Sequence, residues 1–127
     1  MNYYAEIILL AFLAISFLQS GIDKITDWTG NVEWLKSHFS KTILKNQVPF
    51  SLGIILTLEM ISGILAILGM ISLCLNGNTE IALMTAIISS VTLLMLLLGQ
   101  RLAKDYDGAR TIVIYMIPAV LLVYLLQ

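Results

Sequence analysis

The sequence predicts an all-α membrane protein. Four transmembrane helices are expected to form one bundle, in a single domain of residues 1–127, with a short amphipathic helix between the first two spans. Of the 127 residues, 59% are hydrophobic and 12% are charged, and the mean hydropathy is +0.94. Soluble domains carry about 25% charged residues, so this chain has too few charges to cover a soluble surface. It also contains four long apolar stretches, each close to the roughly 20 residues that cross a bilayer as a helix.

The first span is expected at residues 5–22. The residues before it, Met-Asn-Tyr-Tyr, contain no Lys or Arg, whereas a signal peptide begins with a basic segment. We therefore expect this span to be retained. Its end is expected near Ser20 and Gly21, because the charged residues Asp23 and Lys24 follow directly.

The connection of residues 23–49 contains the predicted amphipathic helix. Asn31 can cap a helix that runs through NVEWLKSHFSKTIL. Apolar residues recur in this segment at helical spacing, at Val32, Leu35, Phe39 and Ile43. A helix with one apolar stripe and charged residues elsewhere is expected to lie at the level of the lipid head groups.

The other three spans are expected at residues 50–74, 81–99 and 111–127. Asn-Gly at 76–77 marks a short turn between the second and third spans. A polar connection, GQRLAKDYDGAR at 99–110, separates the third span from the fourth. These short links predict helices that run alternately up and down.

The positive charges predict the orientation of the bundle. All seven Lys and Arg residues lie in the first and third connections, which a four-span chain places on the same side of the membrane. Loops rich in Lys and Arg prefer the cytoplasmic side. We therefore expect connections 23–49 and 100–110 to be cytoplasmic and both termini to lie outside.

Glu59 interrupts the second span and is the most informative single residue. Counted from Pro49 at 1.5 Å per residue, it lies about 15 Å deep, near the middle of a bilayer. Ionisable groups at that depth are expensive and mark functional sites. Small residues share its helix face, at Ser62, Ala66 and Gly69. Because small residues let membrane helices approach closely, Glu59 is expected to face the bundle interior.

We expect a polar cluster around Glu59 that binds a ligand or a partner. Its candidate members are Glu59, Gln19, Ser20, Lys24, Gln100 and Arg101. Lys24 and Arg101 begin at the membrane interface, so they are expected to reach Glu59 only partway, with water or a ligand head group between them. The alternative is that Glu59 is a protonated, hydrogen-bonded packing residue.

The sequence argues against catalysis without excluding it, because no catalytic constellation is present. Cys74 is the only cysteine and His38 the only histidine. Neither an intramolecular disulfide nor a metal site is expected, and His38 is expected to be solvated. The net charge of -1 does not favour binding to nucleic acid phosphates. No cofactor is firmly implied.

Three segments together resemble the DoxX family of small four-span membrane proteins. FLQSGIDKITDW at 17–28 is similar to the S-G-x-x-K element that ends the family's first span. Glu59, followed by Gly63 and Gly69, is similar to the family's E…G…G helix, and GQRLAKDYDGA at 99–109 is similar to the end of its third span. The resemblance covers essentially the whole chain. Its further motif positions are Gly21, Lys104, Asp105 and Gly108.

The resemblance implies a protein of the bacterial cytoplasmic membrane that is associated with redox or stress complexes. The family takes its name from a small subunit of a thiosulfate:quinone oxidoreductase. This chain lacks the paired cysteines of thiol-redox relatives, which puts a catalytic redox role in doubt.

Three functional hypotheses follow. The leading one is a non-catalytic subunit of a membrane redox-associated complex, or a component that binds a quinone or a lipid. Such a protein would contact membrane lipid and either a protein partner or further copies of itself. The alternatives are a small oligomeric transporter or proton-relay element that uses Glu59, and a structural scaffold subunit of a larger membrane complex.

Overall fold

The computed structural model describes residues 3–42 and 46–127, and this part of the chain forms five helices. They are α1 (Tyr4–Thr26), α2 (Trp28–His38), α3 (Val48–Asn76), α4 (Glu80–Leu102) and α5 (Tyr106–Leu126). Four of them are long and apolar enough to cross a membrane, and the short α2 connects the first two. The predicted four-span membrane bundle with a short helix between its first two spans is therefore confirmed.

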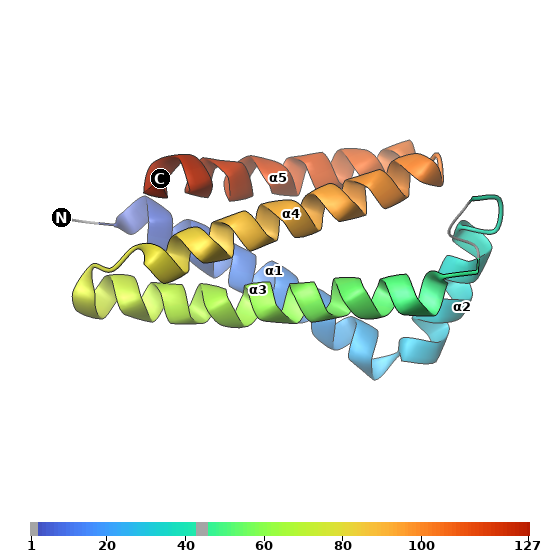
Figure 1. Ribbon diagram of the computed structural model, residues 1–127, viewed down its shortest axis with the longest axis horizontal. Coiled ribbons are helices and arrows are strands. Elements are labelled where there is room, and N and C mark those ends of the chain that lie inside the picture. The colour runs from blue at the N-terminus through green and yellow to red at the C-terminus, as the bar shows by residue number, and fades with distance from the viewer. Residues whose placement is uncertain (1–2, 43–45) are drawn as a thin grey trace.

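The four long helices run alternately up and down (Figure 1). The start of α1, the end of α5 and the turn between α3 and α4 lie at one end of the bundle. At the opposite end lie α2 and the turn between α4 and α5. We call this second end the α2 end.

Every span is longer than the sequence predicts, because helix continues into the polar residues at its ends. The largest difference is at the connection expected over residues 99–110. There α4 continues to Leu102 and α5 begins at Tyr106, so only three residues separate them. The start of α5, expected at Thr111, was therefore predicted five residues too late.

The turn between α4 and α5 is compact because its backbone hydrogen bonds close the end of α4. Lys104 adopts a left-handed conformation with φ 60°. Its N–H donates to the Arg101 carbonyl at 3.1 Å, and the Asp105 N–H donates to the Gln100 carbonyl at 2.9 Å. This pair of bonds is the Schellman motif. Asp105 then caps α5, since its Oδ1 accepts the N–H of Gly108 at 2.9 Å.

Helix α2 differs from the predicted helix at both ends. It begins at Trp28, after the single non-helical residue Asp27. The prediction that Asn31 caps it is wrong, because Asn31 lies inside the first turn. Its backbone N–H and its side-chain amide both donate to the Asp27 carbonyl, at 3.0 and 2.8 Å. The helix ends at His38, and Ile43 of the predicted stripe lies outside the described residues.

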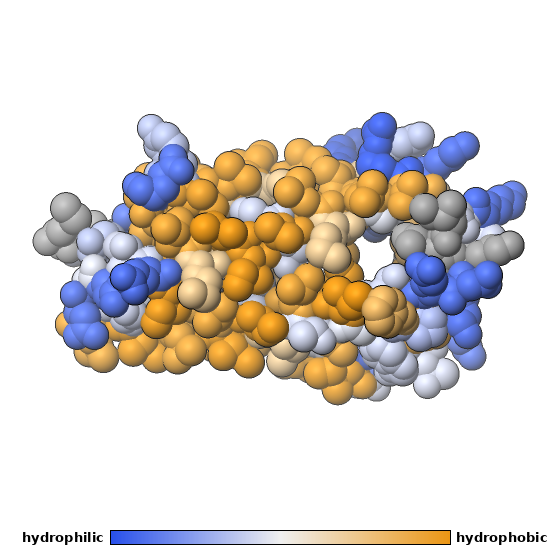
Figure 2. Space-filling model, in the orientation of Figure 1, coloured by the Kyte–Doolittle hydropathy of each residue, from blue (hydrophilic) through white to orange (hydrophobic). Residues whose placement is uncertain are grey.

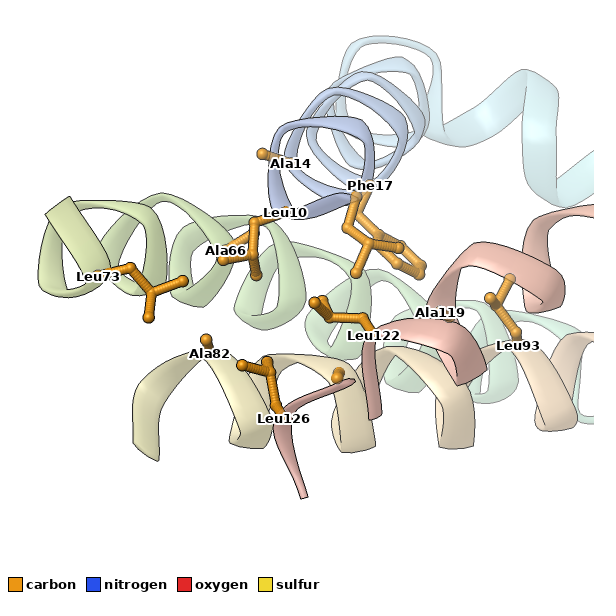
Figure 3. Packing of buried hydrophobic residues seen from close by; sticks show 12 residues of the cluster. Leu10, Ala14, Phe17, Ala66, Leu73, Ala82, Leu93, Ala119, Leu122 and Leu126 are labelled. Atoms are coloured by element: carbon orange, nitrogen blue, oxygen red, sulfur yellow. The ribbon is translucent and has the colours of Figure 1, made fainter. Parts of the chain in front are cut away.

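Small residues let the spans approach closely. A Cβ atom added at Gly63 would lie 2.6 Å from Leu18 Cγ of α1, and one added at Gly69 would lie 3.1 Å from Ala82 Cα of α4. Around these contacts the buried apolar side chains of all four spans form one cluster (Figure 3). Its members include Leu10, Ala14 and Phe17 of α1, Ala66 and Leu73 of α3, Ala82 and Leu93 of α4, and Ala119, Leu122 and Leu126 of α5.

The outside of the bundle is apolar along its length. Figure 2 shows a broad hydrophobic band over the spans, with hydrophilic residues gathered towards both ends. In the most apolar 18-residue segment of each span, only 22–33% is buried inside the bundle. In water such a surface would drive aggregation, whereas lipid tails cover it without cost. The protein is therefore an integral membrane protein with four spans.

Candidate functional site

Two close contacts set the register of α1 against α3 around Glu59. Gly21 packs on the Met60 side chain, and Gly63 packs on Leu18. The two helices are antiparallel, so this register places Lys24 level with residue 57. Lys24 therefore starts about 3 Å nearer the α2 end than Glu59 does, which is within the length of its side chain.

Lys24 and Glu59 form a buried ion pair. Lys24 Nζ lies 2.9 Å from Glu59 Oε1, and the side chains are 17% and 2% exposed. The same Nζ donates a hydrogen bond to Ser20 Oγ at 2.6 Å. The sequence predicts a gap between Lys24 and Glu59, but here the two groups touch. Of the predicted cluster, the structure thus brings Ser20, Lys24 and Glu59 together.

A polar seam continues from this ion pair along the contact between α3 and α4. Glu59 Oε1, Ser62 Oγ and Ser89 Oγ are buried and, among the described residues, have no partner with hydrogen-bond geometry. Lys24 Nζ is the cation in contact with Glu59 Oε1, at 2.9 Å. Ser62 and Ser89 each lie seven residues, about two turns, from the contact of Gly69 with Ala82. They consequently lie at one level of the bundle.

The other predicted members of the cluster lie elsewhere. Gln19 is exposed on α1, and Arg101 is exposed near the end of α4. Gln100 is half-buried and bonds to His38 of α2 instead of Glu59. The predicted cluster therefore divides into the Lys24–Glu59 pair inside the bundle and a second group at the α2 end.

His38 is the centre of that second group, and the expectation that it is solvated is wrong. Its side chain is only 16% exposed. His38 Nε2 lies at hydrogen-bond distance from Gln100 Oε1, at 3.0 Å, and 3.6 Å from Asp105 Oδ2. The imidazole also stacks on Trp34, with ring centroids 4.6 Å apart. The spacing of Trp34 and His38, one helical turn, is the sequence signal that could have indicated this packing.

The motif positions of the α4–α5 turn support this group. Asp105 uses one carboxylate oxygen to cap α5 and the other to face His38. A Cβ atom on Gly108 would lie 2.7 Å from both Asp105 Oδ2 and Gln100 Nε2. Glycine at 108 therefore leaves room for the carboxylate and the amide that hold His38. Lys104 supplies the left-handed residue of the turn.

Two cavities open on the surface near the α2 end. One, of about 450 Å³, is lined by Lys36, Ser40, Asn46 and Pro49. The other, of about 430 Å³, is lined by Leu97, Arg101, Tyr106, Ala109, Arg110 and Val113. We call the second cavity the arginine groove. Neither cavity is lined by Lys24 or Glu59.

The arginine groove combines two cations with an apolar wall. The guanidinium of Arg101 lies over the ring of Tyr106, with Cζ 5.2 Å from the centroid. Arg110 Nη2 donates to Asp107 Oδ1 at 2.7 Å, and both of these side chains are largely exposed. Leu97, Ala109 and Val113 supply the apolar lining. A molecule with an anionic head and an apolar tail matches this lining.

No family model, curated protein or solved structure matches this chain. Within residues 3–42 and 46–127, no three His, Cys, Asp or Glu side chains gather as a group that could hold a metal ion.

Proposed function

We propose that the chain is a non-catalytic membrane component of the DoxX type, and that it binds an amphiphile, a lipid or a quinone, at the α2 end. The observation that carries this proposal is the arginine groove. Its exposed guanidinium groups lie beside an apolar wall between two spans. Sites for amphiphiles combine an apolar groove with a few polar groups that fix the head.

The arginine groove is a better candidate for the head group than Glu59. The Glu59 carboxylate is buried against Lys24, so a ligand head would have to displace an existing charge contact. Arg101 is exposed at the groove. We therefore assign the ion pair to holding α1 against α3, and amphiphile binding to α4 and α5.

The proposal includes attachment to a larger assembly. Most of the apolar segment of each span lies on the outside of the bundle. This surface can pack against lipid, a further copy of the chain or a subunit of a membrane redox complex. The DoxX resemblance supports the redox complex. The small buried share of each span is also compatible with the scaffold hypothesis. That hypothesis differs from the proposal because it requires no bound amphiphile.

Native mass spectrometry of the gently solubilised protein tests the proposal. We expect the chain to retain an amphiphile, and the Arg101→Ala variant to lose most of it because the head loses its cation. Lys41→Ala is the matched control, since it removes an exposed cation from the connection between α2 and α3 but not from the groove.

Two results would contradict the proposal. If Arg101→Ala retains as much amphiphile as Lys41→Ala does, the groove is not the binding site. A protein partner retained without any amphiphile would support the scaffold hypothesis instead.

A further inference from the structure

We infer that the arginine groove selects an anionic phospholipid, with the lipid phosphate between Arg101 and Arg110 and one acyl chain along the apolar wall. This inference rests on the proposed function and names the class of its ligand.

The groove is formed by one stripe from each of two neighbouring helices. Leu97 and Arg101 are one turn apart on α4, and Tyr106, Ala109, Arg110 and Val113 share one face of α5. On α4, Arg101 is nearer the end of the span than Leu97, and on α5, Arg110 is nearer the end than Val113. Each arginine therefore lies nearer the membrane surface than one large apolar residue of its own helix, Leu97 on α4 and Val113 on α5. The head and tail of a phospholipid follow the same order.

The charge of the groove favours a phosphate. Its lining contains two guanidinium groups and no acidic residue. The planar fork of a guanidinium matches the oxygens of a phosphate with two parallel hydrogen bonds. Basic pockets between spans are where anionic phospholipid head groups bind. A quinone head is neutral and does not require the second cation.

The neighbouring acidic side chains leave these cations accessible. Asp107 pairs with Arg110, but both are largely exposed, and such surface pairs contribute little. Asp105 is engaged elsewhere, by the N–H of Gly108 and by His38. Among the described residues, Asp107 is therefore the acidic side chain that competes with the phosphate for Arg110. A variant can remove this competitor.

The experiment titrates the purified full-length protein with phosphatidylglycerol and, separately, with phosphatidylcholine, and measures bound lipid by native mass spectrometry. We expect phosphatidylglycerol to bind more tightly, because the choline cation is repelled by the arginines. Arg101→Gln/Arg110→Gln should weaken phosphatidylglycerol binding by about tenfold or more. The matched control, Lys36→Gln/Lys41→Gln, removes the same charge at the same end and should bind like the unmodified chain.

Two further variants keep the test independent of folding. Arg101→Lys/Arg110→Lys retains the charge without the guanidinium fork and should recover part of the binding. Asp107→Asn should tighten binding severalfold, because the competitor of the phosphate is gone, and a loss of folding cannot produce a gain. Addition of inorganic phosphate alone should not displace the lipid, because free phosphate lacks the tail that the apolar wall holds.

Equal binding of the two lipids, or equal losses in the arginine and lysine variants, would overturn the inference. If a neutral amphiphile such as a quinone stays bound and depends on Arg101, the phospholipid inference fails while the proposed function stands. If no amphiphile binds, both fail.

Discussion

At the scale of single residues, Glu59 and Lys24 show how a charge can be kept inside a membrane bundle. A lone carboxylate at that depth costs several kcal/mol. Lys24 begins nearer the membrane surface and extends along α1 to place its ammonium 2.9 Å from Glu59 Oε1. The pair joins the first and second spans in the register that the contacts of Gly21 with Met60 and of Gly63 with Leu18 set.

A double-mutant cycle on this pair measures its contribution to folding. Lys24→Met leaves the Glu59 carboxylate buried without its countercharge, so we expect it to destabilise the bundle by about 2 kcal/mol or more. Glu59→Gln should also destabilise, because it leaves the ammonium half-buried. The double variant should lose less than the sum of the single losses, as measured by unfolding in detergent. Additive losses would show that the two groups do not interact.

The residue types at this site could be predicted from the sequence, but their pairing could not. The isolated acid in an apolar span identifies Glu59, and Ser20 and Lys24 lie one turn apart near the end of the first span. Whether Lys24 reaches the carboxylate depends on the register of α1 on α3. That register depends on the packing of Gly21 on Met60 and of Gly63 on Leu18. Arg101 lies near the end of α4 and lines the arginine groove instead.

At the scale of elements, Asp105 connects three helices. It closes the turn after α4, caps α5 and faces His38 of α2. The sequence indicated a polar connection here and underestimated the helix, because charged residues within a helix end resemble a loop. Lys104 could not have been predicted as the left-handed residue, since side chains with a Cβ rarely adopt that conformation.

Gly108→Ala tests how tightly this junction is built. The new methyl group would lie 2.7 Å from Asp105 Oδ2 and Gln100 Nε2, so the cap of α5 or the contact with His38 must shift. We expect a loss of about 1 kcal/mol, seen as a lower melting temperature in detergent.

Gly53→Ala is the matched control for that substitution. Among the described residues, a Cβ atom at Gly53 meets only Trp28 Cη2, at 4.0 Å. Alanine in a helix is better than glycine by about 0.5–1 kcal/mol, so this variant should be as stable as the unmodified chain or more so. If both variants behave alike, the junction is not tightly packed around Gly108.

At the scale of the whole molecule, the charges divide the bundle into unlike ends. The six described basic residues all lie towards the α2 end, where α2 and the α4–α5 turn are found (Figure 1). Glu6 and Glu80 are the acidic residues in the first turns at the other end. Composition and the positions of the apolar stretches were enough to predict this architecture, because lipid demands helices of spanning length.

We propose that the α2 end is cytoplasmic, as the positive charges favour. In a Cys74→Ser background, Asn76→Cys and Ser40→Cys place single exposed thiols at opposite ends of the bundle. A maleimide that cannot cross membranes should label Asn76→Cys in intact cells and label Ser40→Cys only after the membrane is opened. The reverse pattern would contradict the orientation.

The three-residue turn between α4 and α5 also makes the chain unusually intolerant of changes in length at this point. One residue inserted between Ala103 and Asp105 would turn α5 by about 100° if α4 stayed in place. The apolar content of the span would be unchanged, and the chain would still cross the membrane four times. Arg110 and Val113, however, would rotate away from Arg101 and Leu97, so the groove would be dismantled while the bundle kept every span.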